Sequence, residues 1–230
     1  MQSLTELSVK NLVKVRADFE LSANFNVGVG ERVALVGKSG SGKTTLLRIL
    51  AGLEPLVGPS DGGQIWLGNE EITHWTPQKR EVGFVFQDAV LFQALSVLDN
   101  VTFGLRMKGI PRSERDSMGL EWLDRVGLRS KAHGAVDTLS GGEKQRVAFV
   151  RALIWKPRFL LLDEPFSALD RGLRESLRAE LLELHQLWPA PLLLVTHDEN
   201  DIQALTTVRL KLVWEPPSQT RQISRELTNV

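Results

Sequence analysis

The sequence contains no cysteine and no tyrosine, and its 28 Lys and Arg residues are balanced by 28 Asp and Glu residues. Without cysteine, the chain forms neither a disulfide-bonded scaffold nor a cysteine-ligated metal site. A formal net charge of zero provides no field over the whole molecule that would attract nucleic acid or an anionic membrane surface. Contact with either partner would therefore depend on local groups.

Long apolar runs are also missing. The longest, at 159–162 and 191–195, are far shorter than the roughly 20 residues that cross a bilayer. Residues 1–16 alternate polar and apolar side chains and lack the continuous apolar segment of a secretory signal. We therefore expect a soluble, cytoplasmic chain. Its 230 residues, 42% of them apolar, suit one compact domain with its own core.

Short apolar runs typical of strands alternate with longer stretches at helical spacing. This order predicts an α/β fold in which uninterrupted apolar strands lie parallel and are covered by helices. The pattern is mostly helical at 88–156, which we interpret as a helical insert between two parts of a core at 1–87 and 157–214. Strands are expected at 32–36, 65–67, 82–86, 159–162, 192–196 and, as the last strand, 208–214; helices are expected at 44–51 and 173–188; a polar tail follows at 215–230.

The sharpest motif is GKSGSGKT at 37–44, which matches the phosphate-binding loop pattern G-x-x-x-x-G-K-[ST]. Its glycines let backbone N–H groups point at phosphate oxygens, and the following helix offers its positive end. Lys43 can reach the β and γ phosphates, while the Thr44 hydroxyl can bind Mg²⁺. A plain Gly/Ser turn is the alternative, which the flanking strand and helix disfavour. The predicted phosphate-binding residues are Gly37, Lys38, Ser39, Gly40, Ser41, Gly42, Lys43, Thr44 and Thr45.

A second motif, FLLLDE at 159–164, is an apolar strand that ends in two carboxylates. A buried strand end would hold Asp163 rigidly near the metal, and Glu164 could orient or deprotonate a water molecule. Strands that merely end in acidic surface residues are common. The upstream phosphate loop favours the functional interpretation.

A third motif, LSGGEKQR at 139–146, opens a helical stretch with Ser140 as its expected N-cap. The order and separation of the three motifs resemble the ATP-binding cassette, the nucleotide-hydrolysing subunit of ABC transporters. The resemblance extends from about residue 7 to residue 205. It implies a P-loop NTPase core with a mostly parallel sheet, a small antiparallel β part and an inserted helical subdomain.

The resemblance also assigns roles that composition and spacing do not reveal. It implies that Gln87 contacts the metal together with Thr44 and Asp163, and that His197 contacts the γ-phosphate. Glu164, His197, Lys43 and Gln87 thereby become the predicted catalytic group. Ser140, Gly141 and Gly142 would face the phosphates held by a second cassette, identical or different. Asp170 would lie in the loop through which the two cassettes communicate and is counted with them among the predicted nucleotide-binding residues. The implied cofactors are ATP and Mg²⁺.

The stretch from Lys79 to Arg106 resembles a narrower group, the cassettes of importers for polyamines, ferric iron, sulfate, molybdate or sugars. It implies transmembrane permease subunits as partners, a peripheral position on the inner face of the cell membrane, and an extracytoplasmic solute-binding protein reached through the permease. No direct nucleic-acid contact is expected. In the family the insert docks on a short helix of the permease, and the candidate docking residues here, which suit core packing equally well, are Val90, Leu91, Phe92 and Leu95.

The chain departs from the family pattern in three places. Where an aromatic residue usually stacks on adenine, it has Arg16, whose guanidinium could stack instead, and Phe19 lies close by. The loop at 55–63 is longer than usual, with no assigned chemistry. The chain also stops soon after the cassette, so regulation through a C-terminal sensing domain is not expected.

Two alternatives remain at this stage. One is a cassette ATPase that acts on a soluble or nucleic-acid partner and moves no solute. The other is a nucleotide-binding regulatory subunit with little catalysis, against which the presence of both Glu164 and His197 argues.

Overall fold

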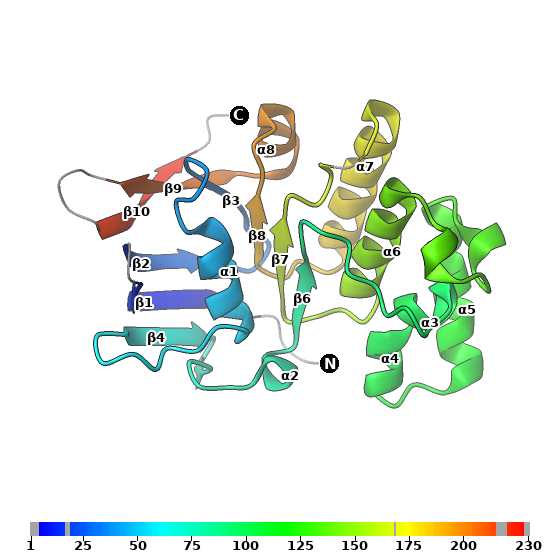
Figure 1. Cartoon of the computed structure of the whole chain (residues 1–230), viewed down its shortest axis with the longest axis horizontal. Helices are drawn as coiled ribbons and strands as arrows, with labels where there is room; N and C mark the ends of the chain where they lie inside the picture. Colours follow the sequence, from blue (N-terminus) through cyan, green and yellow to red (C-terminus); the bar gives the residue numbers. More distant parts are fainter. Residues whose placement is uncertain (1–4, 17–18, 168, 215–219, 228–230) are drawn as a thin grey trace.

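The computed structural model describes residues 5–16, 19–167, 169–214 and 220–227. Within these ranges, no helix is long and apolar enough to span a membrane. Ten strands within the same ranges form a single sheet, and the helices are arranged around it and beyond one of its edges (Figure 1).

One part of the sheet is parallel. Its strands are β3 (Arg32–Val36), β6 (Val82–Val85), β7 (Phe159–Asp163), β8 (Leu192–Val195) and β9 (Val208–Trp214). They lie in the order β9-β3-β8-β7-β6, and each neighbouring pair is parallel. Every residue of β7 and β8 is buried, as expected for uninterrupted apolar strands covered on both faces. These strands confirm the α/β prediction.

The other part of the sheet is antiparallel. Its strands are β1 (Leu7–Val15), β2 (Glu20–Val27), β4 (Gly62–Leu67) and β5 (Glu70–Glu71), in the order β5-β4-β1-β2. A bulge interrupts β1, where Asn11 has a φ of 47°. Gly63 faces this bulge, and a Cβ there would lie 2.4 Å from the Cα of Leu12, so the close approach requires glycine.

A tenth strand corrects the prediction that 208–214 is the last strand. Strand β10 (Thr220–Leu227) falls within the segment predicted as a polar tail. It pairs antiparallel with β9 and parallel with β2. The sequence TRQISREL shows no clean alternation of apolar and polar residues, so its extended form depends on its two partner strands. Strand β10 thus joins the two parts of the sheet.

The described helices include the two that were predicted individually, at 44–51 and 173–188, those of the predicted helical insert, and two that were not predicted, at 77–80 and 199–205. They are α1 (Lys43–Ala51), α2 (Pro77–Arg80), α3 (Val97–Val101), α4 (Phe103–Met107), α5 (Arg112–Arg125), α6 (Gly141–Leu153), α7 (Arg171–Leu187) and α8 (Glu199–Leu205), with two short 3₁₀ helices, η1 (Arg129–Lys131) and η2 (Val136–Thr138). Between β6 and β7 the described elements are all helical. Figure 1 shows α3, α4 and α5 gathered at one end of the molecule, far from β1, β2 and β4.

The two faces of the parallel sheet pack against different helices. Leu160 and Leu162 belong to a hydrophobic cluster with residues of α6 and α7, whereas Phe159 and Leu161 belong to a cluster with residues of α1. The alternation follows from the two-residue period of a strand. It places Asp163, the last residue of β7, on the α1 face.

The loop at 55–63 is held by a single buried carboxylate. One oxygen of Asp61 lies 2.7 Å from Nζ of Lys14 and accepts a hydrogen bond from the N–H of Gly58 at 2.8 Å. The other oxygen accepts from the N–H of Val15 at 3.0 Å. These donors hold the pKa of Asp61 at about 2 despite burial. The loop therefore has a structural anchor on β1.

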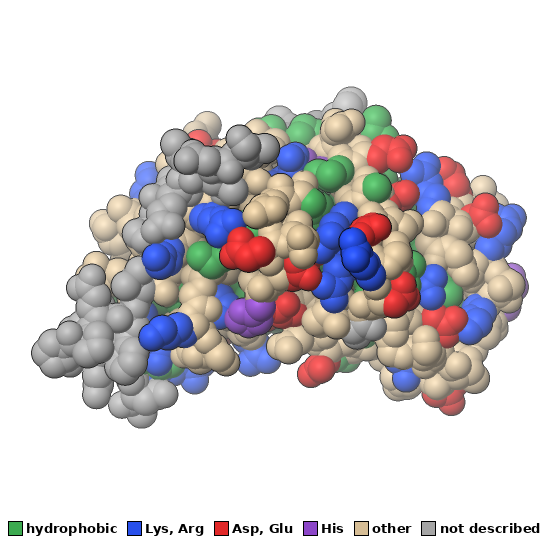
Figure 2. Space-filling model, turned by 90° about the horizontal axis from the view of Figure 1, so that it is seen from above, with side chains coloured by type: hydrophobic (Ala, Val, Ile, Leu, Met, Phe, Trp, Pro, Cys, Tyr) green, Lys and Arg blue, Asp and Glu red, His purple; other side chains and the backbone are tan. Residues whose placement is uncertain are grey.

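The surface carries both signs of charge. On the face shown in Figure 2, Lys and Arg side chains are interspersed with Asp and Glu side chains. This agrees with the balanced composition. The visible face thus offers no broad basic surface of the kind that binds nucleic acid.

Candidate functional site

The phosphate loop occupies the turn between β3 and α1. Gly40 and Gly42 have φ values of 71° and 102°, which only glycine adopts without strain. A Cβ at Gly37 would lie 2.9 Å from both the carbonyl oxygen of Leu212 and Oγ of Ser41. The loop thus needs glycine at these positions both for its backbone angles and for its close packing.

Lys43 lies at the first position of α1 and is nearly buried. Its Nζ donates hydrogen bonds to the carbonyl oxygens of Gly37 and Lys38, at 2.8 and 3.0 Å. Burial lowers the pKa of Lys43, and the nearby carboxylates of Glu164 and Asp163 oppose that effect. The ammonium group is therefore held inside the loop, at the N-terminal end of α1, which is the positive end of the helix dipole.

Asp163 meets the start of α1, as the period of β7 requires. Its Oδ2 accepts a hydrogen bond from Oγ1 of Thr44 at 2.9 Å. Burial raises the pKa of Asp163, while the Thr44 hydroxyl and the charge of Lys43 act in the opposite direction. A buried carboxylate next to a hydroxyl is the kind of oxygen pair through which Mg²⁺ binds, together with substrate phosphates and water.

Glu164 follows at the end of β7 with a φ of 48°, a left-handed conformation that costs free energy for a residue other than glycine. Its Oε1 is buried and accepts no hydrogen bond from the described residues. Nε2 of His197 lies 3.3 Å from this oxygen, within ion-pair range. Burial raises the pKa of Glu164, and His197 is the main influence lowering it. The Glu164 side chain is 12% exposed and lines the cavity, a position from which a carboxylate can act on a water molecule.

These groups share one cavity of about 280 Å³. The phosphate loop from Ser39 to Thr45 lines it, together with Phe19, Gln87, Asp163, Glu164, Val195 and His197. The structure thus brings the predicted metal and catalytic residues together with the predicted phosphate-binding residues, except Gly37 and Lys38, which are not part of the lining. Among the described residues, no group of three or more His, Asp or Glu residues is placed to hold a metal ion by itself.

Ser140, Gly141 and Gly142 lie outside the lining of this cavity. Ser140 is the N-cap of α6, as predicted, and forms a capping box with Glu143. The N–H of Glu143 donates to Oγ of Ser140 at 3.3 Å, and the N–H of Ser140 donates to Oε2 of Glu143 at 2.9 Å. Ser140 and Gly141 are exposed, so this helix start is open to a second molecule.

Asp170 also lies outside the cavity lining and is the N-cap of α7. Its Oδ1 accepts a hydrogen bond from the N–H of Leu173 at 3.0 Å. Asp170, predicted to bind nucleotide, thus lies at an exposed helix start outside the cavity, as Ser140 does.

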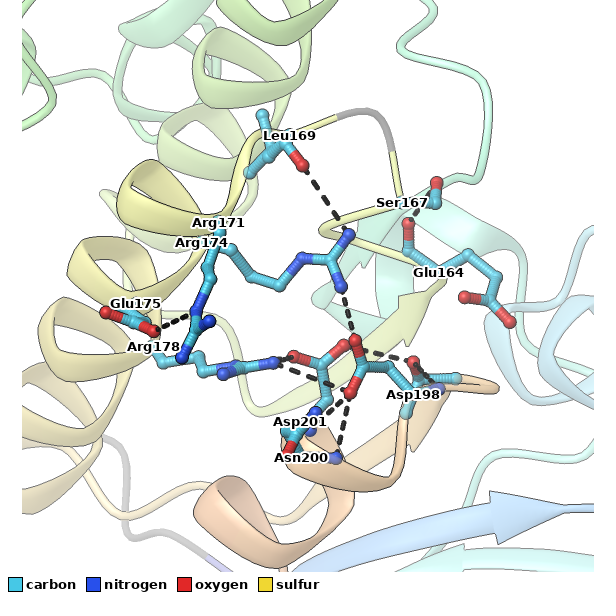
Figure 3. Close-up of polar contacts among 11 residues, drawn as sticks. Glu164, Ser167, Leu169, Arg171, Arg174, Glu175, Arg178, Asp198, Asn200 and Asp201 are labelled. Carbon is cyan, nitrogen blue, oxygen red and sulfur yellow. Dashed lines mark hydrogen bonds and ion pairs between the residues drawn. The ribbon is translucent and has the colours of Figure 1, made fainter.

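A polar network that sequence reasoning did not foresee surrounds Asp198, the residue that follows His197 in the chain (Figure 3). Arg174 of α7 donates to Asp198 and to the carbonyl oxygen of Leu169. Asp198 follows His197 directly and accepts a hydrogen bond from the N–H of Asn200 at 2.8 Å, at the start of α8. The loop that carries His197 is thus attached to α7.

A second ion pair also holds the loop that carries His197. Arg178 of α7 pairs with Asp201 of α8, and Asp201 also accepts a hydrogen bond from Oγ1 of Thr196 at 3.1 Å. The Asp201 side chain is 3% exposed. Because both helices share this buried pair, α7 and α8 fix the position of the turn that carries His197.

Arg16, the predicted adenine contact, lies outside the cavity lining. Its guanidinium pairs with Glu54, with Nη2 and Oε1 2.5 Å apart. Phe19 lines the cavity instead, and the guanidinium of Arg221 lies over its ring. Sequence reasoning missed Arg221 because the residue belongs to the segment predicted as a tail.

Comparison with known proteins agrees with this geometry. The family model described as ABC transporter matches residues 21–167. The chain belongs to the ABC transporter family. The match includes the phosphate loop and the carboxylates at the end of β7, which are the groups that the structure brings together.

Curated relatives in this family include importer subunits. The chain is 50% identical over 184 residues to an Fe(3+) ions import ATP-binding protein of Streptomyces avermitilis, covering 80% of this chain and 52% of the relative. It is 43% identical over 195 residues to a sulfate/thiosulfate import ATP-binding protein of Nephroselmis olivacea, covering 84% of this chain and 56% of the relative. The chain thus spans about half the length of these relatives.

Two solved structures have the same fold. One is the dimeric structure of an ATP-binding cassette in a post-hydrolysis state bound to ADP and Pi, with 28% identity and a TM-score of 0.79. The other is the dimeric structure of a bacterial ABC transporter cassette, with 28% identity and a TM-score of 0.82. Each comparison covers 96% of this chain and 98% of the neighbour. The mixed sheet of parallel and antiparallel strands is therefore that of an ABC cassette.

Proposed function

We propose that this chain is the ATP-hydrolysing subunit of an ABC transporter. The observation that carries the proposal is the cavity between α1 and the ends of β7 and β8, where a phosphate loop, a Thr44–Asp163 pair and a Glu164–His197 pair meet. Family membership and the names of the relatives support it.

The phosphate loop would hold the triphosphate of ATP. Backbone N–H groups at the start of α1 and the Lys43 ammonium neutralise negative charge, which counts most as the γ-phosphoryl group departs. Lys43 now donates to two loop carbonyl oxygens. Phosphate oxygens are stronger acceptors because they are charged, so the ammonium exchanges these partners for the nucleotide.

Thr44, Asp163 and Gln87 would hold Mg²⁺, since all three line the cavity and the Thr44 hydroxyl lies 2.9 Å from Oδ2 of Asp163. When bound, this ion neutralises charge on the β and γ phosphates. Burial raises the pKa of Asp163, so a cation beside it would favour the ionised carboxylate.

Glu164 would position and polarise the attacking water. Its side chain is 12% exposed and lines the cavity, so a water molecule in the cavity could donate to its carboxylate. His197, with Nε2 3.3 Å from Oε1 of Glu164, would lie beside that water and the γ-phosphate. The raised pKa of Glu164 strengthens it as a general base.

The working unit would be a dimer of cassettes. Ser140, Gly141 and Asp170 lie at exposed helix starts outside the cavity of their own chain. Helix starts attract phosphate, so these groups would complete the nucleotide site of a second cassette. Both solved neighbours are dimeric structures. The second cassette would be a copy of this chain or a related one.

A membrane permease would bind to an apolar groove beside α4. This cavity of about 620 Å³ is lined by Phe84, Phe86, Phe92, Phe103, Met107 and Trp155, among others. Met107 is 66% exposed and Phe92 is 43% exposed. Such exposed apolar side chains mark a binding surface.

Of the four docking residues named from the sequence, only one lines this groove. Phe92 lines the groove. Leu91 is 4% exposed and belongs to the hydrophobic core, which fits the alternative of core packing. Val90 and Leu95 are not part of the lining.

Import would be the direction of transport. The two relatives are named for import of Fe(3+) ions and of sulfate or thiosulfate. The permease would place this chain on the inner face of the membrane, and an extracytoplasmic solute-binding protein would deliver the solute to the permease.

Phosphate release tests the enzymatic part of this proposal. The wild-type chain should release phosphate from MgATP, and Glu164→Gln should lower the rate by about 100-fold or more while ATP binding persists. The matched control is Glu175→Gln, which changes an exposed residue paired with Arg171. Equal rates for wild type and Glu164→Gln would contradict the role of Glu164.

Co-purification tests the transport part. Tagged Glu164→Gln, solubilised from host membranes with MgATP, should retain a multi-span membrane protein. Met107→Glu, which places a charge in the groove, should release that protein and leave ATP binding intact. Recovery of soluble proteins or nucleic acid alone would instead support the non-transport ATPase.

A further inference from the structure

The backbone of Glu164 is unusual in two ways. Its φ of 48° is left-handed, and it directly precedes Pro165, a position at which a residue normally adopts an extended conformation. Such a strained conformation persists only where the surrounding structure holds it in place. The contacts around Glu164 therefore determine the direction in which its carboxylate points.

Two sets of contacts hold the Glu164 backbone itself. Its N–H donates to the carbonyl oxygen of Val195, the last residue of β8, at 2.9 Å. Its carbonyl oxygen accepts hydrogen bonds from the N–H of Ser167 at 3.2 Å and from Oγ of Ser167 at 3.0 Å (Figure 3). Because Ser167 is exposed, water competes for the bond from its hydroxyl. The carbonyl group of Pro165 is left to another partner.

That partner is a buried side chain of α6. Nε2 of Gln145 donates to the carbonyl oxygen of Pro165 at 3.0 Å, and Gln145 is only 1% exposed. Phe149, four residues later on the same face of α6, packs against Phe166, with ring centroids 6.0 Å apart. Helix α6 thus holds both residues that follow Glu164, one through a polar contact and the other through an apolar contact.

A glutamine at this position needs an explanation. The residues that follow it on α6, from Val147 to Val150, are buried and apolar, and a buried polar side chain costs free energy unless it is hydrogen-bonded. The carbonyl oxygen of Pro165 supplies that bond. The amide is therefore spent on the residue next to Glu164.

We propose that Gln145 is a positioning residue for Glu164, holding the strained backbone that aims the carboxylate into the cavity. The inference rests on the proposed function, in which Glu164 acts on the attacking water, and adds a residue to it. Gln145 does not line the cavity, so it acts through Pro165. Without its donor, Glu164 would relax toward the extended conformation favoured before proline, and small displacements of a reacting group are costly.

The first test replaces the amide without emptying its space. Gln145→Met is similar in size and cannot donate. It should lower kcat for phosphate release by about tenfold, with KM for ATP within about threefold of wild type. Gln145→Asn keeps an amide that is one methylene shorter, so its kcat should lie between those of wild type and Gln145→Met. If Gln145→Met does not fold, the fall in kcat of Gln145→Asn decides the question.

The matched control removes another buried donor to a backbone carbonyl. Thr102 is 1% exposed, and its Oγ1 donates to the carbonyl oxygen of Leu98 at 2.8 Å. It lies in the helical insert and outside the lining of the cavity. Thr102→Val should lower the melting temperature, as Gln145→Met does, and leave kcat unchanged.

A second test asks whether the effect passes through Glu164. In the Glu164→Gln background, Gln145→Met should lower the residual rate of phosphate release by less than about twofold, because residues that act as a unit are not additive. Single-turnover measurements give these slow rates.

Three results would overturn the inference. An unchanged kcat with a lowered melting temperature would show that Gln145 only satisfies a buried carbonyl group. A loss confined to KM would place its effect on ATP binding. An equal loss in the wild-type and Glu164→Gln backgrounds would show that Gln145 acts independently of Glu164. Absence of phosphate release by the wild-type chain would instead contradict the proposed function itself, so the two failures are distinguishable.

Discussion

The guanidinium of Arg174 on α7 forms an ion pair with the carboxylate of Asp198, the residue that directly follows His197. Figure 3 shows Arg174 extending from its helix toward this carboxylate. The same guanidinium donates to the carbonyl oxygen of Leu169, in the turn that leads into α7. A single side chain thus connects that turn with the loop carrying a proposed catalytic histidine.

Removal of Arg174 should impair turnover more than binding. We expect Arg174→Ala to lower kcat by about 10- to 100-fold, since small displacements of reacting groups are costly, with KM for ATP changed by less than about threefold. Steady-state phosphate release gives both parameters. Arg174→Lys should recover part of kcat because it restores the charge beside Asp198.

The matched control for Arg174 is Arg171→Ala, one turn earlier on α7, where the side chain is 94% exposed. A variant of Arg174 with unchanged kcat, or with KM and kcat altered in proportion, would contradict a positioning role.

The fall of kcat at low pH should be caused by protonation of Glu164. Burial raises the pKa of this carboxyl group above its ordinary value, and a general base must be ionised to take a proton from water. kcat should therefore fall as pH drops, beginning at a higher pH than an exposed glutamate would allow. Phosphate release measured from pH 5 to 9 checks this. If kcat of His197→Gln falls over the same acid range, the fall is caused by Glu164. If the fall disappears in this variant, it is caused by His197 and the prediction is wrong.

Asp61 should make stability depend on pH in the acid range. Its native pKa is about 2, against an ordinary value of 3.8. Because the native value is the lower one, the stabilisation is present above about pH 4 and is lost as pH falls toward 2. The difference corresponds to about 2 kcal/mol of unfolding free energy at neutral pH. Urea unfolding of wild type and Asp61→Asn at several pH values should show curves that converge at low pH.

Arg80 should be essential for the packing of α1. Its buried guanidinium donates to the carbonyl oxygens of Ile49 and Leu50, both at 2.7 Å, and to that of Thr73, also at 2.7 Å. Arg80→Ala would leave these buried acceptors without their donor, so we expect a loss of about 3 kcal/mol in unfolding free energy. Thermal and urea unfolding measure it.

Lysine should replace Arg80 poorly. An ammonium group is compact and cannot match a planar fork that reaches several carbonyl oxygens. Arg80→Lys should therefore recover less than half of the lost stability, and full recovery would show that charge alone suffices. The exposed change Arg112→Ala on α5, where the side chain is 78% exposed, provides the control.

The parallel part of the fold could be predicted because its information is local. Uninterrupted apolar runs defined β7 and β8, and the two-residue period of β7 determined that Asp163 faces α1. The phosphate loop was also predictable, since glycine at fixed spacing reflects backbone angles that only glycine tolerates.

Other features depend on contacts that no local pattern encodes. Strand β10 is polar and becomes extended only by pairing with β2 and β9. Arg80 caps carbonyl oxygens 30 and 31 residues away in the chain. Arg221 meets Gly40 across 181 residues. Such long-range partners become visible only when the sheet is assembled.

The position of β10 between β2 and β9 has a consequence for biosynthesis. Before β10 leaves the ribosome, the antiparallel strands and the parallel strands have no hydrogen-bonded connection within the described sheet, and the edges of β2 and β9 are both unpaired. Open strand edges promote association between chains. Completion of the sheet must therefore wait for β10, and a nascent chain paused before this strand should be more prone to aggregate than the finished chain.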